Sequence, residues 1–229
     1  MDMVVGNNGV VSSSSIKRNV SLYIYNLHDN SLAYSVEDFA IEGEEATAVR
    51  FMGDELYVCT AVVAKFTDPV YFFDLTDYEN IIFNDTGIIE GYSTSLIDLG
   101  EGFLLGMGVE SRDYSKIEVY EDAGDRVVSV DKLLFDGDVS SEYKAYLINR
   151  EKNLFGFGAR YFAPSDIYEV GKNYYNNVYV LVQFDGYDLN IIEICTIPSG
   201  VDPDTVRCAY VDGYLYITTL TDFVVVNVE

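Results

Sequence analysis

A pattern of four short segments recurs along this chain and stops partway through its fifth round. Each round begins with a turn followed by an apolar run. These runs start at residues 10, 56, 103, 154 and 214, in steps of 46, 47, 51 and 60. A repeat of this length indicates one supersecondary unit copied several times. The feature limits the choice of fold more than any other, because each unit must stack on its neighbours to bury its apolar face.

The segments of each round have the composition of β-strands. The opening turn carries pairs such as Asn-Gly or Asp-Gly, as in Asn8-Gly9-Val10-Val11, and these residues tolerate the positive φ of hairpin turns. An aromatic-rich strand such as Val70–Asp74 comes next. A return strand then closes on glycine, as in Phe39–Gly43 and Gly87–Gly91. A fourth strand, such as Thr94–Asp98, precedes the next turn.

Four strands joined by short turns make one blade of a β-propeller. No segment of ten or more residues shows a sustained helical period, which argues against βαβ units. We therefore predict an all-β fold, a β-propeller of four-stranded antiparallel blades, with five blades and an incomplete last blade. The chain 1–229 forms a single domain in this prediction, with repeats at about 3–43, 45–91, 93–137, 142–200 and 205–229.

The incomplete last round leaves two alternatives for how the blades are completed. The round ends at Asn227-Val228-Glu229, after three of its four strands. In the first alternative the ring has five blades, and Met3-Val4-Val5 completes the last one. In the second, the chain is a piece of a larger ring. We favour the first, because the rounds number four and a half in a chain counted from its own Met1.

Composition excludes some partners. The chain has 38 acidic and 14 basic residues, and a net charge of −24 repels phosphate backbones, so we expect no nucleic-acid binding. No run of 18 apolar residues occurs, so we expect no membrane insertion. Cys59, Cys195 and Cys208 are expected as small buried thiols. Cys195 and Cys208 are predicted at opposite ends of neighbouring blades, too far apart for a disulfide.

Several runs resemble a known family. They are Val49–Asp54, residues 67–77, residues 90–96 and Leu104–Gly108. In this order they are similar to runs in the bacterial family described as secreted proteins with a C-terminal β-propeller domain distantly related to WD-40 repeats. The resemblance is best over residues 45–160. It implies a propeller fold and an extracellular or cell-surface location, and it implies no activity. Two histidines of the family's runs are absent here, so this chain cannot do any chemistry that needs them.

Acidic side chains, Glu44 and Asp204 among them, are predicted to gather where the connections between blades emerge, around the mouth of the channel. The candidate for a metal is Asp136-Gly137-Asp138 with Glu142, because a glycine lets two carboxylates turn toward one point and Ca²⁺ takes several oxygen ligands. The spacing is not that of an EF-hand loop. The alternative is that these residues only form turns, which are rich in Asp and Gly for conformational reasons, and that no cofactor binds.

A long connection at about residues 160–177 is the second candidate site. It carries or adjoins five aromatic residues: Tyr161, Phe162, Tyr168, Tyr174 and Tyr175. Long loops in compact domains are often functional, and exposed Tyr rings suit a sugar, peptide or protein ligand. The alternative is that these rings pack onto the outer strands of their own blade.

Catalysis finds little support in the sequence. The single histidine, His28, is predicted in a turn on the face opposite the channel mouth, and no Cys/His cluster with zinc spacing occurs, so we assign no catalytic residue. We predict a non-catalytic recognition or scaffolding propeller that binds a protein, peptide or glycan through an acidic and aromatic face. The alternative is a glycoside-acting enzyme with a carboxylate pair at the channel mouth, for which Asp98 and Glu142 are candidates.

Overall fold

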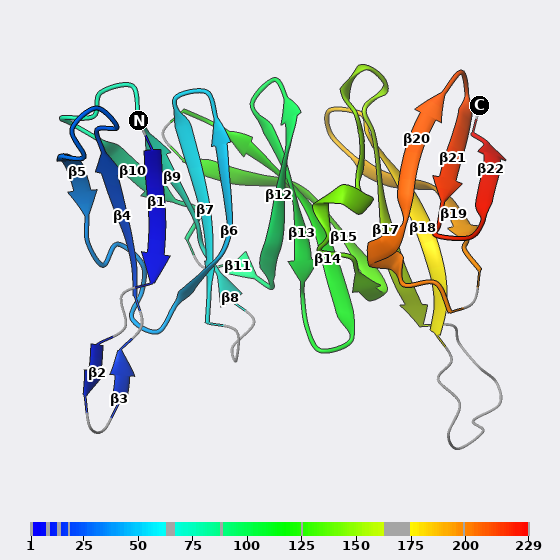
Figure 1. Ribbon diagram of the computed structural model, residues 1–229, viewed down its shortest axis with the longest axis horizontal. Helices are drawn as coiled ribbons and strands as arrows, with labels where there is room; N and C mark the ends of the chain where they lie inside the picture. The colour runs from blue at the N-terminus through cyan, green and yellow to red at the C-terminus, as the bar shows by residue number, and fades with distance from the viewer. Residues whose placement is uncertain are drawn as a thin grey trace.

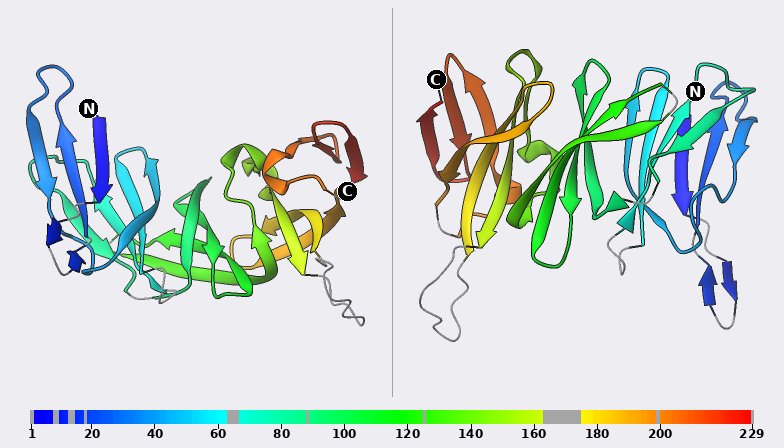
Figure 2. Two further views of the ribbon diagram at one scale, coloured as in Figure 1. Left: turned by 60° about the horizontal axis from the view of Figure 1, so that its bottom comes forward. Right: turned by 180° about the vertical axis from the view of Figure 1, so that it is seen from behind.

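The computed structural model describes residues 2–7, 10–12, 15–17, 19–62, 67–87, 89–124, 126–162, 175–198 and 200–228. These residues form antiparallel sheets that follow one another along an arc, with the two chain termini at opposite ends (Figure 1). Figure 2 shows the same succession from two other sides. The prediction of an all-β fold built from antiparallel sheets is confirmed, and the number of blades stays a prediction.

The N-terminal half of the arc contains two of these sheets. The first sheet has the order β1-β4-β5 and consists of β1 (Asp2–Asn7), β4 (Val20–Tyr25) and β5 (Leu32–Val36). The second sheet has the order β10-β9-β7-β6 and consists of β6 (Glu45–Met52), β7 (Glu55–Ala61), β9 (Val70–Asp74) and β10 (Ile82–Asp85). Two small hairpin sheets pair β2 (Val10–Ser12) with β3 (Ser15–Lys17), and β8 (Thr67–Asp68) with β11 (Ile89–Glu90).

An eight-stranded sheet contains two four-stranded units. We call them the third and fourth units, because they follow the first and second sheets along the chain. The third unit consists of β12 (Tyr92–Gly100), β13 (Phe103–Val109), β14 (Tyr114–Asp122) and β15 (Val127–Val139). The fourth unit consists of β16 (Leu147–Asn149), β17 (Leu154–Phe162), β18 (Tyr175–Phe184) and β19 (Leu189–Thr196). The last sheet has the order β20-β21-β22 and consists of β20 (Arg207–Val211), β21 (Tyr214–Thr218) and β22 (Phe223–Asn227).

Three short 3-10 helices lie among the described residues of the later units, two of them before the inner strands β16 and β20 and one between β16 and β17. They are η2 (Tyr143–Ala145), η3 (Arg150–Lys152) and η4 (Pro203–Thr205). In the part of the chain that the structure describes, no helix has the length and apolar character needed to cross a membrane.

One glycine allows the third and fourth units to join. The end of β15 pairs with β17, with Gly137 opposite Tyr161. Gly137 has a φ of 146°, and a β-carbon at this position would overlap the carbonyl oxygen of Arg160. Only glycine permits both this backbone conformation and this close approach. The two units are therefore linked by main-chain pairing as well as by side-chain packing.

The core lies between successive sheets as separate apolar layers. One layer joins the first and second sheets around Leu22, Val58 and Phe73. Further layers join the second sheet to the third unit, the third unit to the fourth, and the fourth unit to the last sheet. Each inner unit is therefore apolar on both faces, as expected for stacked blades.

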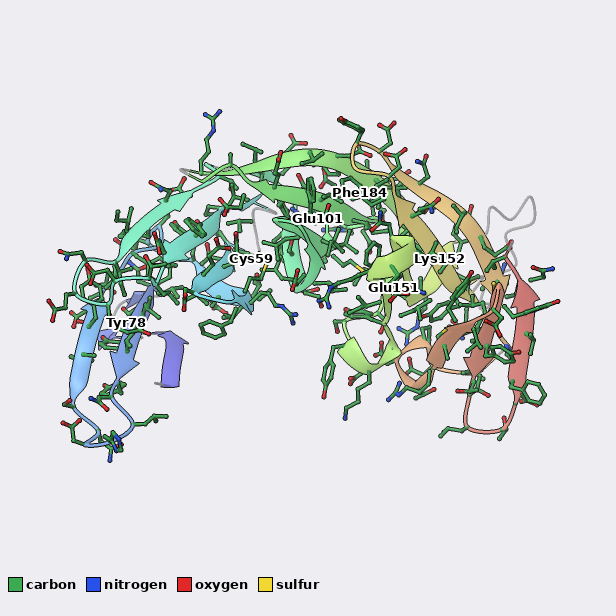
Figure 3. The ribbon with its side chains drawn as sticks, turned by 90° about the horizontal axis from the view of Figure 1, so that it is seen from above. Cys59, Tyr78, Glu101, Glu151, Lys152 and Phe184 are labelled. Atoms are coloured by element: carbon green, nitrogen blue, oxygen red, sulfur yellow. The ribbon has the colours of Figure 1, made fainter. Side chains whose placement is uncertain are left out.

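The N-terminal segment does not complete the last sheet, contrary to our expectation. Met3-Val4-Val5 lies in β1, where Val4 is opposite Tyr23 of β4. Seen from above, the first and last sheets stand apart at the two ends of the arc (Figure 3). The run Val10-Val11 was expected to open the first blade, but it lies in the separate β2–β3 hairpin. The place beside β4 is taken by β1 instead.

Two return strands begin earlier than predicted. They are β5 at Leu32–Val36 and β10 at Ile82–Asp85, whereas the glycine-closed runs predicted Phe39–Gly43 and Gly87–Gly91. A short turn after the preceding strand brings the chain back at once, so the first residues after that turn form the return strand. The glycine-closed runs belong to the connections toward the next blade, and Ile89–Glu90 there forms β11.

Candidate functional site

A pocket of about 650 Å³ opens between the second sheet and the third unit, and we call it the acidic pocket. It lies where the β6–β7 and β12–β13 turns meet the ends of β9 and β14, on the side of the molecule from which Figure 3 is drawn. Met52 and Phe72 contribute apolar surface. Six carboxylates line it: Asp54, Glu55, Asp74, Asp98, Glu101 and Asp122.

Turn conformation explains why these acidic residues are there. The carboxylate of Asp98 accepts a hydrogen bond from the Gly100 N–H at 2.7 Å, and that of Asp122 accepts one from Gly124 at 2.7 Å. Glu101, labelled in Figure 3, has a φ of 54° in the β12–β13 turn. Asp and Gly are favoured in tight turns for these reasons. Because turns of two neighbouring units meet here, residues selected by local conformation also concentrate negative charge.

Two carboxylates of the acidic pocket have pKa values shifted in opposite directions. Burial raises the pKa of Glu55, and the nearby charges of Asp122 and Asp74 raise it further, although Tyr57 donates a hydrogen bond to it at 3.1 Å. The pKa of Asp74 is lowered, because the Thr76 N–H and hydroxyl donate to it at 2.9 and 2.7 Å. The pocket therefore combines a carboxyl that binds its proton more tightly than an ordinary glutamate with one that releases it more readily than an ordinary aspartate.

One cation lies at the edge of the acidic pocket. The Arg150 guanidinium forms an ion pair with Asp98 at 3.2 Å and also donates to the Asp98 carbonyl oxygen at 3.0 Å. Arg150 belongs to η3, so the contact ties the fourth unit to β12. The described lining of the pocket itself contains no lysine or arginine. Most of its negative charge is thus left for a ligand or solvent.

The carboxylates are too dispersed to chelate an ion. Among the residues that the structure describes, no group of three or more His, Cys, Asp or Glu side chains is placed to hold a metal ion. A chelated cation needs several oxygens at one point. Dispersed carboxylates instead suit a ligand that carries several separate positive charges.

The residues predicted to bind calcium do not gather. Asp136 and Asp138 are exposed and lie within β15, not in a connecting turn. Glu142 accepts a hydrogen bond from the Lys144 N–H at 3.1 Å and caps η2. Asp138 lines a separate pocket of about 90 Å³, in which Arg160 forms an ion pair with Asp202 at 3.3 Å.

The proposed enzymatic pair Asp98 and Glu142 is also separated. Asp98 contacts Arg150, which follows β16, whereas Glu142 precedes η2 and β16. The two carboxylates therefore lie toward opposite ends of this inner strand. Glu44, expected at the channel mouth, is buried and accepts hydrogen bonds from Thr60 and Tyr71. The acidic pocket lies on the face where the tight turns within each unit emerge. We had expected acidic residues to gather on the other face, where the connections between blades emerge.

Only one of the five candidate aromatic rings can be placed. Tyr161 is half-buried and packs against Phe135, with ring centroids 5.7 Å apart. Phe162 and Tyr175 are opposite each other in the β17–β18 pairing, and their side chains lie outside the described part of the structure. Tyr168 and Tyr174 also lie outside it. Phe135 belongs to β15 of the third unit, so Tyr161 packs against the neighbouring unit and not against the outer strands of its own blade. The binding site at the five aromatic residues stays a prediction.

The cysteines form no disulfide in the structure. Cys59 and Cys195 are buried and Cys208 is half-buried. Cys195 and Cys208 both belong to the apolar layer between the fourth unit and the last sheet. Burial raises the pKa of Cys195 to about 11 and that of Cys208 to about 12, so both thiols are unreactive at neutral pH.

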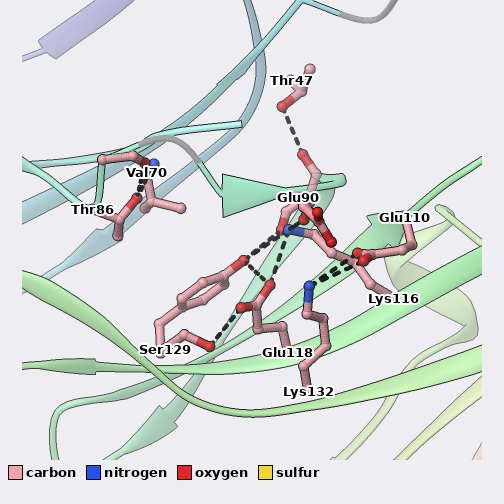
Figure 4. Close-up of polar contacts among 12 residues, drawn as sticks. Thr47, Val70, Thr86, Glu90, Glu110, Lys116, Glu118, Ser129 and Lys132 are labelled. Atoms are coloured by element: carbon pink, nitrogen blue, oxygen red, sulfur yellow. Dashed lines mark hydrogen bonds and ion pairs between the residues drawn. The ribbon is translucent and has the colours of Figure 1, made fainter. Parts of the chain in front are cut away.

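A buried ion pair on β14 was missed by the sequence analysis (Figure 4). The Lys116 ammonium lies 3.0 Å from the Glu118 carboxylate, and both side chains are almost fully buried. Tyr120 donates to Glu118 at 2.9 Å and Ser129 donates at 2.6 Å. The Lys116 ammonium also donates to the Glu90 carbonyl oxygen at 3.4 Å. The partners satisfy the buried charges, and all of them except the Glu90 carbonyl oxygen belong to β14 and β15, so this cluster offers no open site.

Comparison with known proteins identifies the fold family. A family model described as "Beta propeller domain" matches residues 9–217. An uncharacterised protein of Methanocaldococcus jannaschii is 28% identical over 185 residues, which cover 79% of this chain and 26% of the relative. One from Archaeoglobus fulgidus is 27% identical over 187 residues, covering 80% and 26%. The chain thus spans about a quarter of the length of these curated relatives.

Two solved structures are similar to this chain at low sequence identity. In the complex of KlAtg21 with the coiled coil of AgAtg16, a matching chain has a TM-score of 0.51 at 8% identity, covering 96% of this chain and 65% of that one. The β-propeller domain of the Trilobed protease from Pyrococcus furiosus has a TM-score of 0.48 at 10% identity, covering 98% and 67%. Both curated relatives are archaeal, so a bacterial, secreted, C-terminal domain is not shown by them.

Proposed function

This chain belongs to the β-propeller domain family, and we propose that it is a non-catalytic recognition propeller whose acidic pocket binds a basic segment of a partner protein. The observation that carries the proposal is the presence of six carboxylates around one pocket of about 650 Å³. Charge of one sign concentrated in a pocket attracts and orients a partner of the opposite sign.

The lining of the pocket favours lysine and arginine side chains over a bare ion. Glu55 and Asp122 lie close together, but no three of the described carboxylates are placed to hold one metal ion. Phe72 and Met52 add apolar surface, against which the methylene stem of a lysine or arginine can pack while its charge reaches a carboxylate. A peptide with several basic residues would satisfy several carboxylates at once.

Calorimetric titration with a flexible peptide of alternating glycine, lysine and arginine tests the proposal. We expect saturable binding that weakens as salt rises, because salt screens exposed charges. The double variant Asp54→Asn/Asp122→Asn removes two pocket carboxylates, and we expect it to weaken binding by roughly tenfold. The matched control Asp113→Asn/Asp188→Asn removes two exposed carboxylates outside the pocket. Absence of binding, or an equal loss in the control, would refute the proposal.

Glycoside hydrolysis is a second candidate, because one observation favours it. Glu55 has a raised pKa beside Asp122 and Asp74, and carboxyls with separated pKa values are the usual acid and base of glycosidases. Incubation with a panel of glycosides would test this. Turnover that is lost in Glu55→Gln would support the enzyme, and absence of turnover on every substrate would count against it.

We also propose an extracellular or cell-surface location. The support is the resemblance of the runs at 49–54, 67–77, 90–96 and 104–108 to a family of secreted proteins. Immunoblots of the culture medium, the cell surface and the cytosol would test it. Detection in the cytosol alone would contradict the proposed location.

A further inference from the structure

Arg50 is a half-buried cation whose side chain has no partner among the described residues. In this part of the chain, its Nε is the one buried side-chain nitrogen or oxygen that makes no hydrogen bond. No ion pair between described residues includes Arg50, whereas Arg150 and Arg160 each pair with an aspartate. Buried polar groups almost always have a partner, so an exception calls for an explanation.

The strand pairing gives the place of Arg50. It belongs to β6 and is opposite Tyr57 of β7, a fully buried residue of the apolar layer between the second sheet and the third unit. Residues opposite each other in antiparallel strands have their side chains on the same face. Ala48 and Met52, two residues to either side of Arg50, also pack against this layer. Arg50 therefore lies between two neighbouring sheets within the arc, away from both of its ends (Figure 1).

The acidic pocket begins one residue pair away from Arg50. Met52, which lines that pocket, follows Arg50 on the same face of β6 at roughly 7 Å along the strand. Glu55, another lining residue, is opposite Met52 and is thus the diagonal neighbour of Arg50, about 7–8 Å away. Tyr57 donates a hydrogen bond to Glu55 at 3.1 Å. A cation without a partner is therefore adjacent to a pocket lined by six carboxylates.

Charge limits the ligands that can bind to Arg50. A guanidinium suits a carboxylate or a phosphate, because two of its parallel N–H groups donate to two oxygens of the anion. A free anion is repelled by a chain of net charge −24. A carboxylate is acceptable when the same ligand also carries a positive charge that the acidic pocket can bind. The ligand that meets both conditions is a zwitterion with its two charges about one residue apart.

We infer that Arg50 and the acidic pocket together recognise the C-terminal residue of a peptide when that residue is lysine or arginine. The inference rests on the proposed function, since the acidic pocket binds the basic side chain. Arg50 binds the C-terminal carboxylate through its Nε and one terminal nitrogen. The flexible four-carbon stem of a lysine spans the gap of roughly 7 Å between Arg50 and Met52. A basic residue inside a peptide offers no carboxylate and leaves Arg50 without a partner.

Calorimetric titration with two peptides of one sequence tests the inference. Both alternate glycine and lysine and end in lysine, and one has a free C-terminal carboxylate where the other has an amide. On net charge alone the amide should bind more tightly to a chain of −24, because it lacks one negative charge. We instead expect the acid to bind more tightly by roughly tenfold, the effect of one charge-assisted contact.

Matched arginine variants locate the effect. In Arg50→Gln the acid should lose its advantage over the amide, while the amide should still bind. Arg112→Gln changes the net charge equally at an exposed residue of the β13–β14 turn, and it should keep the advantage of the acid. Far-ultraviolet circular dichroism checks that both variants fold.

A third peptide provides a test on the wild type alone. Three glycines after the last lysine move the carboxylate away from the basic side chain, so the advantage of the acid over the matching amide should disappear. Four results would overturn the inference and leave the proposed function standing: an amide that binds the wild type as tightly as the acid or more tightly, a preference for the acid that survives in Arg50→Gln, an equal loss in Arg112→Gln, or a preference that survives the glycine extension. Absence of binding by both lysine peptides would overturn the proposed function and this inference together.

Discussion

The layer at the junction between the second sheet and the third unit contains a buried charged cluster of the third unit, whereas the layer at the junction between the fourth unit and the last sheet is almost entirely apolar. In the first, Lys116, Glu118 and Tyr120 form a buried hydrogen-bonded cluster beside Tyr57 and Phe72. In the second, Leu181, Leu215 and Ile217 pack together, and Tyr179 donates one hydrogen bond to the Ala145 carbonyl oxygen at 3.0 Å.

The difference teaches that stacked sheets of one chain can be joined by unlike chemistry. An apolar layer is stabilised by burial and tolerates small shifts between the sheets. A buried ion pair adds little net stability over apolar residues of the same size, but its hydrogen bonds require particular partners. We therefore expect the polar junction to be the one that is most sensitive to loss of a single partner.

Removal of the buried cation is expected to have the largest effect. Lys116→Met leaves the Glu118 carboxylate buried without its cation and should lower the free energy of unfolding by about 3–5 kcal/mol. Urea denaturation measures this. Lys132→Met is the control, because its ion pair with Glu110 is partly exposed and should contribute no more than about 1 kcal/mol. Equal losses in the two variants would contradict the special role of the buried pair.

The double variant Lys116→Met/Glu118→Leu sharpens this test. It replaces both charges with apolar side chains and should recover most of the stability that Lys116→Met loses. Urea denaturation of the two variants under one buffer condition makes the comparison. A double variant as unstable as the single one would show that the junction needs the charges themselves.

Matched tyrosine variants compare the two junctions directly. Tyr120→Phe loses a hydroxyl that donates to Glu118 and accepts from Lys116, and hydrogen bonds to charged groups contribute about 1.5–3 kcal/mol. Tyr179→Phe loses a bond to a neutral carbonyl, which contributes about 1 kcal/mol. Thermal or urea denaturation should thus rank Tyr120→Phe as the less stable variant. The reverse order would contradict the contrast between the junctions.

A smaller, pH-dependent effect on stability is expected at Glu44, a buried carboxyl that accepts hydrogen bonds from neutral groups. Burial raises its pKa, and the Thr60 hydroxyl and the Ile41 N–H donate to it at 2.7 and 3.2 Å. The pKa of Glu44 is therefore higher in the folded protein than in the unfolded chain. The protonated Glu44 side chain contributes its full stabilisation below the unfolded-state pKa, and this stabilisation is lost as the pH rises through the folded-state pKa.

The variant Glu44→Gln should remove this dependence. The stability of the wild type relative to Glu44→Gln should therefore fall as the pH rises above the unfolded-state pKa of a glutamate, about 4.3. Urea denaturation at several pH values measures the difference, with the exposed Glu37→Gln as the control for loss of one carboxylate. Parallel pH profiles for wild type and Glu44→Gln would contradict the expectation.

The strand content was predictable because its causes are local. The turns at Asp54-Glu55 and Glu101-Gly102 and the strand Val70–Asp74 follow from turn conformation and strand composition. The carboxylates of the acidic pocket could be recognised from the sequence as turn residues. The pocket itself could have been predicted by placing the tight turns of neighbouring blades on one face. The burial of Lys116 and Glu118 was not predictable. In the run 116–119, polar and apolar residues alternate, which is typical of a strand with one face in water.

By itself, the sequence determined the repeat, the alternation along each strand and the positions of the tight turns, because these depend on neighbours in the chain. The tertiary structure alone decided which alternating face is covered. It buried Lys116 and Glu118 inside the stack of sheets and brought six carboxylates into one pocket. Those outcomes depend on how sheets stack, which is a matter of contacts between residues far apart in the sequence.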